Sequence, residues 1–193
     1  MICSGNEDDT ERLYALNELT DEQLREHFEN RVELTQDDIE YADYVWQLYC
    51  SDNPIRLENL INNDDFQFEY LPDALKTHLK RFPTIKNGLN ELENHVLDVV
   101  TTQKPKSRRE LLGNLLSNQG FYGFGDSQYE RIITSLRPLF SSFDPVKLTK
   151  KGKEVLENKT NYYSQIRDNQ LYLGGSLKYN FLYNTDTNRI LKL

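Results

Sequence analysis

The chain has 193 residues, of which 37% are hydrophobic and 28% charged, and its formal net charge is −8. No apolar run approaches the roughly 18–20 residues of a membrane-spanning helix, so we expect no membrane span. The polar, acidic residues 1–13 predict neither a signal peptide nor a transit peptide. Two cysteines, Cys3 and Cys50, are too few for a disulfide framework, and we expect a reduced cytoplasmic protein with Cys50 buried.

The charge changes sign near the middle of the chain. Residues 1–103 carry 8 Lys/Arg and 23 Asp/Glu, a net charge of −15, whereas residues 104–193 carry 15 Lys/Arg and 8 Asp/Glu, a net charge of +7. Such an asymmetry between halves indicates a nucleic-acid or acidic partner for the basic half. The acidic half can also dock on the basic half and mask it.

Helix-start motifs recur through the first 87 residues. The sequence from Leu19 to Leu24 is a capping box with a hydrophobic staple, and the same motif returns from Leu34 to Ile39. Asn53-Pro54 and Leu71-Pro72-Asp73 each predict a further helix start. Helical spacing predicts these inward-facing residues: Leu24, Phe28, Ile39, Ala42, Val45, Trp46, Tyr49, Leu57, Leu60, Ile61, Leu75, His78, Leu79 and Phe82.

Residues 88–160 follow the order of a winged helix. Asn90 and Ser107 begin two helices, and a glycine-rich turn over residues 120–125 precedes a third helix for which Asp126 is the expected cap. An extended segment over residues 146–148 then leads to the helix of the string LTKKGKEVL, where Gly152 allows close packing against a neighbour. Helical spacing predicts these inward residues: Leu92, Val96, Leu97, Val100, Leu111, Leu112, Leu115, Leu116, Tyr129, Ile132, Ile133, Leu136, Val155 and Leu156.

Residues 170–193 alternate apolar and polar side chains, which predicts strands with breaks at Gly174-Gly175 and at residues 184–188. The predicted fold class is mainly α with a small β component. The predicted parts are an acidic helical segment (1–87), a winged-helix-like domain (88–160) and a C-terminal β extension (161–193) that packs on the winged helix.

Four segments together resemble a known family: LKRFPTIKNGLNELENHVL (79–97), GDSQYERI (125–132), LTKKGKEVL (148–156) and YLGGSLKYNFLYN (172–184). They look like an uncharacterised bacterial family that pairs an N-terminal α/β domain of unknown function with a winged-helix-like C-terminal half. The resemblance runs from about Leu16 to the C-terminus and implies that this chain matches the C-terminal part only. Tyr172 and Phe181 stand where the family is expected to have tryptophans, and the family brings no catalytic residues.

The main functional hypothesis is a non-enzymatic, regulatory binding module that contacts nucleic acid through the basic winged helix. Arginine can meet phosphates or guanine edges, and glutamine can read adenine. Residues 127–137 would be the recognition helix, with lysines around the wing on the phosphates. The candidate nucleic-acid-binding residues are Arg108, Arg109, Gln128, Arg131, Arg137, Lys150, Lys151 and Lys153.

The alternative hypothesis is protein docking or homo-oligomerisation through the winged helix and the tyrosine-rich tail, because aromatic residues are enriched at interfaces. The other interpretation of the tail is that its alternate aromatic residues cover the core of a small hairpin. Nothing in the sequence indicates a catalytic constellation, a cofactor, a metal site or a small-molecule substrate. Glu91 and His95, four residues apart, are expected to form a helix-face ion pair rather than to bind metal. His78 is expected to be a core or boundary histidine, and the glycine-rich turn a tight turn rather than a phosphate cradle.

Overall fold

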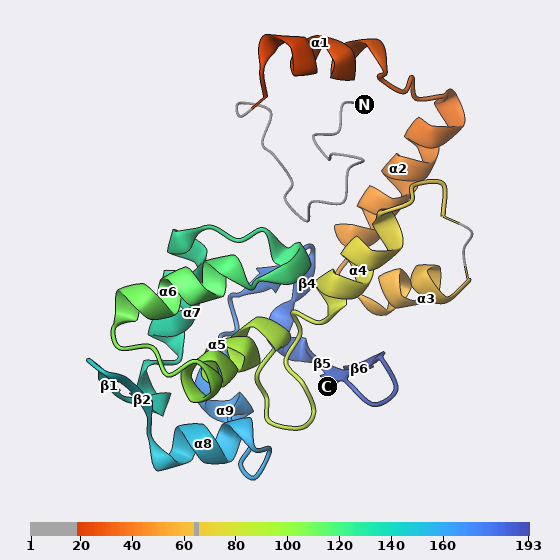
Figure 1. Cartoon of the computed structure of the whole chain (residues 1–193). Coiled ribbons are helices and arrows are strands. Elements are labelled where there is room, and N and C mark those ends of the chain that lie inside the picture. The colour runs from red at the N-terminus through yellow and green to blue at the C-terminus, as the bar shows by residue number, and fades with distance from the viewer. Residues whose placement is uncertain (1–18, 64–65) are drawn as a thin grey trace. The chain divides into compact units, whose positions relative to one another are not determined.

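The computed structural model describes residues 19–63 and 66–193 (Figure 1). Cys3 and residues 1–13, on which two of the sequence predictions fall, lie outside the described residues. The chain divides into two compact units, residues 1–44 and residues 45–193. The first unit has 3 Lys/Arg and 14 Asp/Glu, a net charge of −11, and the second has 20 and 17, a net charge of +3. None of the described helices is both long and apolar enough to cross a membrane.

The first unit contains α1 (Asp21–Glu29) and the beginning of α2 (Gln36–Tyr49). The predicted capping box at Thr20 is confirmed, because its hydroxyl accepts the Gln23 amide and the Gln23 side chain accepts the Thr20 amide. The predicted burial is wrong: Leu24, Phe28 and Ile39 are exposed, and α1 contains no buried residue. Helical periodicity shows which side of a helix is apolar and does not supply a partner surface.

The second unit begins with the end of α2, followed by α3 (Ile55–Asn63) and α4 (Leu71–Leu79). Among the predicted inward residues of this region, those that are buried are Val45, Leu57, Leu60, Leu75, His78, Leu79 and Phe82. Trp46 and Cys50 are exposed, which corrects both predictions. Trp46 stacks on Tyr49 at the end of α2, with ring centroids 5.5 Å apart.

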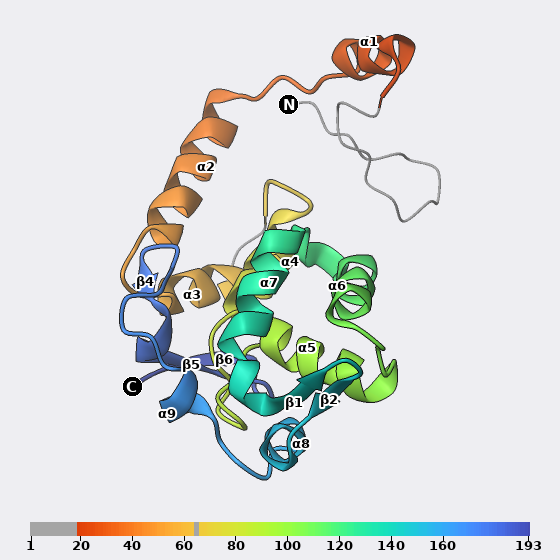
Figure 2. The ribbon, with the colours of Figure 1, turned by 90° about the vertical axis from the view of Figure 1, so that its left-hand side faces the viewer.

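The next elements follow the order of a winged helix: three helices, a two-stranded hairpin and a further helix (Figure 2). They are α5 (Glu91–Thr102), α6 (Arg108–Ser117), α7 (Asp126–Ser135), β1 (Phe140–Phe143), β2 (Val146–Leu148) and α8 (Lys150–Leu156), with the short turns η2 (Gly120–Tyr122) and η3 (Arg137–Leu139). Strands β1 and β2 pair antiparallel. Their shared core contains Leu97, Leu111, Leu115, Ile133 and Val155, all fully buried.

One local prediction in this region is wrong, one strand was missed, and one prediction is confirmed. Asp126 is not the cap of α7, because Gly125 is the capping residue and its N–H donates to the Gln128 side chain at 2.9 Å. Strand β1 was not predicted. The close packing at Gly152 is confirmed, since a Cβ there would lie 2.5 Å from the Leu139 carbonyl oxygen.

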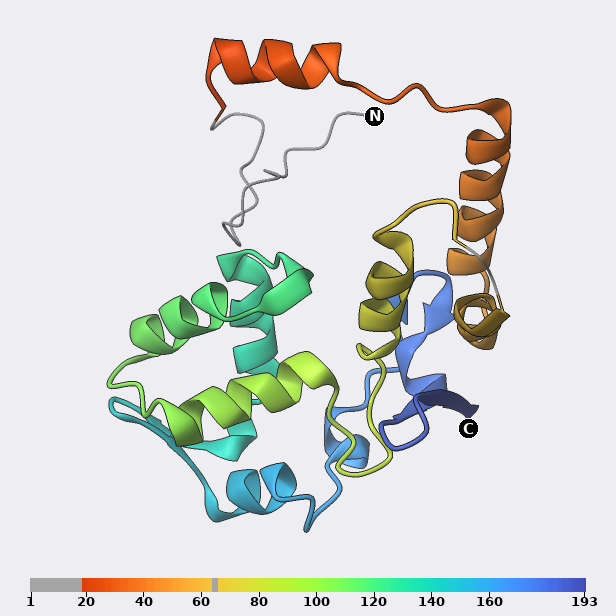
Figure 3. The same ribbon diagram turned by 45° about the vertical axis from the view of Figure 1, so that its right-hand side comes forward.

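The C-terminal extension contains α9 (Tyr163–Ile166), β3 (Tyr172–Leu173), β4 (Ser176–Leu177), η4 (Lys178–Asn180), β5 (Phe181–Asn184) and β6 (Arg189–Lys192). Both predicted breaks are confirmed as turns of antiparallel pairs. Tyr183 forms a bridge with Thr84, so the extension lies beside the end of α4 (Figure 3). The fold is mainly helical with small β-hairpins, as predicted, while the predicted domain boundaries stay predictions.

A buried ion pair joins the extension to α5. Lys178 Nζ lies 2.7 Å from Glu93 Oε1, and the two side chains are only 4% and 6% exposed. The other Glu93 oxygen accepts the Asn90 N–H at 2.8 Å, which completes the predicted cap of α5. A buried carboxylate with both oxygens bonded is stabilised, because its partners replace lost water.

Candidate nucleic-acid interface and polar groove

The β1–β2 hairpin gathers basic residues from separate segments. The Val146 amide donates to the Pro105 carbonyl at 3.1 Å, which ties the hairpin to the connection between α5 and α6. We define the wing cluster as the cationic residues of this region: Lys104, Lys106, Arg108, Arg109, Arg137 and Lys147. All of them are exposed except Arg108, which is half-buried. The surface around the hairpin therefore presents cations from three segments of the chain.

Phe143 of β1 is the meeting point of two predicted site residues. The guanidinium carbons of Arg108 and Arg137 lie 5.1 and 5.2 Å from the Phe143 ring centroid. Arg137 also donates to the Phe140 carbonyl at 2.9 Å. These contacts hold both side chains near the hairpin, because a guanidinium over an aromatic face is attracted to it.

Glu130 of α7 is a part of this interface that the sequence did not single out. Its carboxylate accepts from Arg108 Nε at 2.9 Å and also from Nη2, and Arg108 Nη2 lies 3.2 Å from the Thr134 hydroxyl. Both ion-paired side chains are nearly two-fifths exposed. Glu130 therefore neutralises part of the positive charge on the outer face of α7.

The two remaining predicted residues on α7 have different roles. Gln128 caps the helix through its side-chain oxygen, so this oxygen is already occupied. Arg131 is exposed and has no side-chain partner among the described residues. Of the predicted contacts from the recognition helix, Arg131 is thus the one fully available to a ligand.

The three lysines of α8 do not share a common contact among the residues that the structure describes. Lys150 pairs with Glu154 at 3.8 Å, and Lys151 Nζ lies 4.9 Å from the Tyr162 ring centroid. The Tyr162 amide in turn donates to the Asn87 carbonyl, which places Lys151 toward the turn before α5. Lys153 is exposed and is without a side-chain partner in the described part of the chain. The structure does not join these lysines to the Phe143 contacts.

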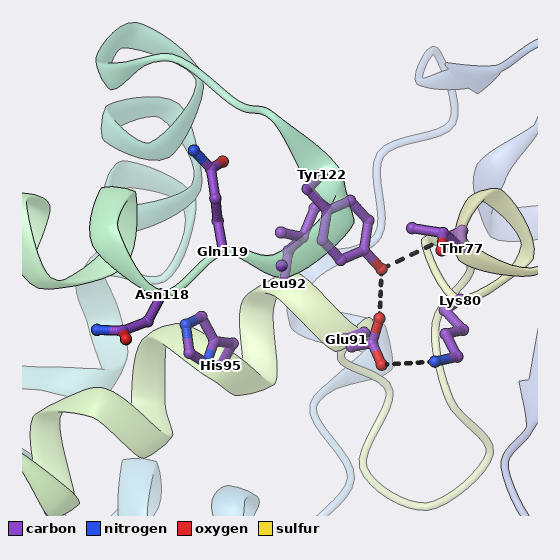
Figure 4. A pocket seen from close by; sticks show the side chains of 9 residues that line it. Thr77, Lys80, Glu91, Leu92, His95, Asn118, Gln119 and Tyr122 are labelled. Carbon is purple, nitrogen blue, oxygen red and sulfur yellow. Dashed lines mark hydrogen bonds and ion pairs between the residues drawn. The ribbon is translucent and has the colours of Figure 1, made fainter. Parts of the chain in front are cut away.

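A recess of about 300 Å³ lies between α4, α5 and the turn that contains η2 (Figure 4). Its polar lining includes Thr77, Lys80, Glu91, His95, Asn118 and Tyr122. Glu91 is held at both oxygens: Lys80 Nζ lies 3.2 Å from one, and the Tyr122 hydroxyl donates to the other at 2.5 Å. The predicted Glu91–His95 ion pair is therefore replaced by contacts with Lys80 and Tyr122.

Burial is the main cause that raises the pKa of Tyr122, and the hydrogen bond to Glu91 raises it further. The Tyr122 hydroxyl therefore remains a donor at neutral pH. His95 Nε2 and the Tyr129 hydroxyl are buried without a hydrogen-bond partner among the described residues. No group of three or more metal-ligating side chains occurs within residues 19–63 and 66–193. The recess therefore offers hydrogen-bonding side chains around the Lys80–Glu91 ion pair, in which the two charges neutralise each other.

A second recess, of about 380 Å³, has the same ion pair in its lining. It shares Lys80 and Glu91 with the first and is otherwise lined by Thr84, Asn94, Tyr183, Thr185 and Asn188. We call the two recesses together the polar groove. Sequence reasoning missed it, because its side chains come from segments as distant as α4 and the β5–β6 turn.

Comparison of the chain with protein-family models, with curated proteins and with solved structures found no match. The family resemblance therefore stays a prediction.

Proposed function

We propose that this protein is a non-enzymatic binding module that contacts nucleic acid through the wing cluster and the outer face of α7. The observation that supports this most is the convergence of Arg108 and Arg137 on Phe143, beside a hairpin tied to the connection that carries Lys104 and Lys106. A helix flanked by a cationic hairpin is a recurring way to meet the phosphates of a duplex. We also propose that the protein acts in the cytoplasm and that it is related to the bacterial family that its sequence resembles.

The outer face of α7 itself favours backbone contacts over base reading. Arg131 is its one arginine, Gln128 is engaged in the cap, and Asp126 and Glu130 are anionic. Phosphate contacts position a protein on a duplex without reading its sequence. We therefore expect binding with little sequence preference and a strong dependence on salt.

Fluorescence anisotropy of a labelled mixed-sequence duplex, titrated with the full chain at several salt concentrations, tests the proposal. The triple variant Lys104→Glu, Lys106→Glu and Lys147→Glu should weaken binding at least about tenfold and reduce the slope of log affinity against log salt by about 2–3. Its control carries the same charge change at Lys76, Lys159 and Lys192. Equal loss in both triple variants, or no binding at low salt, would contradict the proposal.

Protein docking remains a second candidate, favoured by a different observation. No large apolar side chain described between residues 88 and 160 is exposed, whereas Trp46, Tyr172, Leu191 and Leu193 all are. Exposed aromatic and aliphatic side chains are typical of interfaces between proteins. Sedimentation of the full chain and of the Tyr172→Ser, Leu191→Ser variant tests for self-association; an unchanged monomer in both leaves no support for a homo-oligomer.

A further inference from the structure

We propose that the polar groove binds a neutral, hydroxyl-rich ligand of the size of one or two sugar rings. This inference is independent of nucleic-acid binding, because none of the wing-cluster residues lines the groove. Its two recesses, of about 300 and 380 Å³, each match the lower end of the range for small-molecule sites.

The charges of the groove argue for a neutral ligand. Its charged lining residues are Lys80 and Glu91, which neutralise each other at 3.2 Å and are both less than half exposed. An anionic ligand would have to compete with Glu91 for the ammonium group, and a cationic ligand would have to compete with Lys80 for the carboxylate. A hydroxyl group can accept from Lys80 and donate to Glu91 without separating the pair.

The remaining polar side chains of the groove are hydrogen-bonding groups that can pair with the hydroxyl groups of a ligand. Thr77, Asn118 and His95 lie on the first recess, and Thr84 and Asn188 lie on the second. Three of these side chains already bond within the protein: Thr84 donates to Asn87, Asn118 donates to the Asn114 carbonyl, and Asn188 accepts from Tyr183, each at 2.9 Å. The donors and acceptors that they retain, together with Thr77 and His95, can pair with sugar hydroxyl groups, which both donate and accept. Figure 4 shows His95 and Asn118 at one end of the first recess, with Lys80, Glu91 and Tyr122 at the other. A ring between the two ends would meet polar groups on opposite sides.

The groove also offers an apolar surface for the C–H face of a sugar. Leu92 is buried in the wall of the first recess, and Tyr122 supplies a half-buried ring. The Tyr122 hydroxyl is fixed on Glu91, so its ring is held in one orientation without cost at binding. A peptide ligand would need an unpaired strand edge or side-chain pockets, and the groove is instead lined by side chains of hydrogen-bonding type.

The test is saturation-transfer NMR of the full chain with maltose, cellobiose and diacetylchitobiose, each up to about 20 mM, a range that detects millimolar affinity. Glucosamine and glucuronic acid serve as charged probes, and an uncharged Gly-Ser-Gly-Asn peptide serves as the peptide probe. We expect saturable binding of at least one neutral disaccharide, at least about fivefold tighter than either charged sugar.

Two variants locate the binding. Asn118→Leu and Thr185→Val each remove hydrogen-bonding groups from one recess with little change in volume, and at least one should weaken the disaccharide about tenfold. Thr160→Val, outside the groove, should bind as the unaltered chain does. Circular dichroism confirms that each variant is folded. Absence of saturable sugar binding, preference for a charged sugar or the peptide, or unchanged affinity in both groove variants would overturn the proposal.

Discussion

The Lys178–Glu93 ion pair makes a quantitative prediction about stability. Replacing Lys178 by methionine leaves the Glu93 carboxylate, which is 6% exposed, with the Asn90 N–H as its one remaining partner among the described residues. Removing one member of a buried pair typically costs about 3–5 kcal/mol, because the other charge is left without compensation. For a domain with a free energy of unfolding of about 5–15 kcal/mol, this is a large fraction of the total.

Urea unfolding followed by circular dichroism measures this cost. The double variant Lys178→Met, Glu93→Gln removes both charges and keeps an oxygen for the Asn90 amide, so it should recover most of the loss. Lys76→Met is the matched control, because its partner Asp73 is 3.5 Å away and both side chains are more than half exposed, and it should cost less than about 0.5 kcal/mol. A Lys178→Met cost no greater than that of the control would refute the reasoning.

Three further predictions concern pH, packing and binding. Burial lowers the pKa of His78 to about 4, so the unfolded chain takes up a proton at higher pH than the folded chain does. The free energy of unfolding should therefore fall by up to about 3 kcal/mol between about pH 6.5 and pH 4. In acid unfolding curves, His78→Phe should flatten this decline. Gly175→Ala should lower the melting temperature, since a Cβ there would lie 1.8 Å from the Cys50 carbonyl oxygen, whereas Gly113→Ala, with nothing within 4 Å, should not. Glu130→Gln should tighten duplex binding by about three- to tenfold in anisotropy, because it frees Arg108; weaker binding would mean that Glu130 positions that arginine.

The local features of the fold followed from the sequence. The caps at Thr20 and Asn90 were predicted because each hydrogen bond joins residues three positions apart, and such bonds depend only on residue type and spacing. The turn at Gly174-Gly175 was predicted for the same reason, since glycine marks the places where the chain can reverse. Helical periodicity also identified the buried residues of α4 and of helices α5 to α8.

Burial of the first two helices could not be derived in this way. Leu24 and Phe28 have helical spacing but are exposed, because periodicity describes one helix and burial needs a second surface. The same limit applies to Gln128, which was predicted from the sequence to read an adenine edge, with Asp126 as the expected cap. Only the backbone geometry at Gly125 shows that Gln128 caps α7.

The sequence by itself determined the class of the fold, the order of the helices from α1 to α8 and the sign of the charge on each half. Tertiary structure decided which charges are available, because it pairs Arg108 with Glu130 and buries Lys178 against Glu93, 85 positions away. It also decided the polar groove, whose walls come from α4, α5, the η2 turn and the last hairpin. Contacts between such distant residues depend on how the helices and hairpins pack, which no local pattern of side chains specifies.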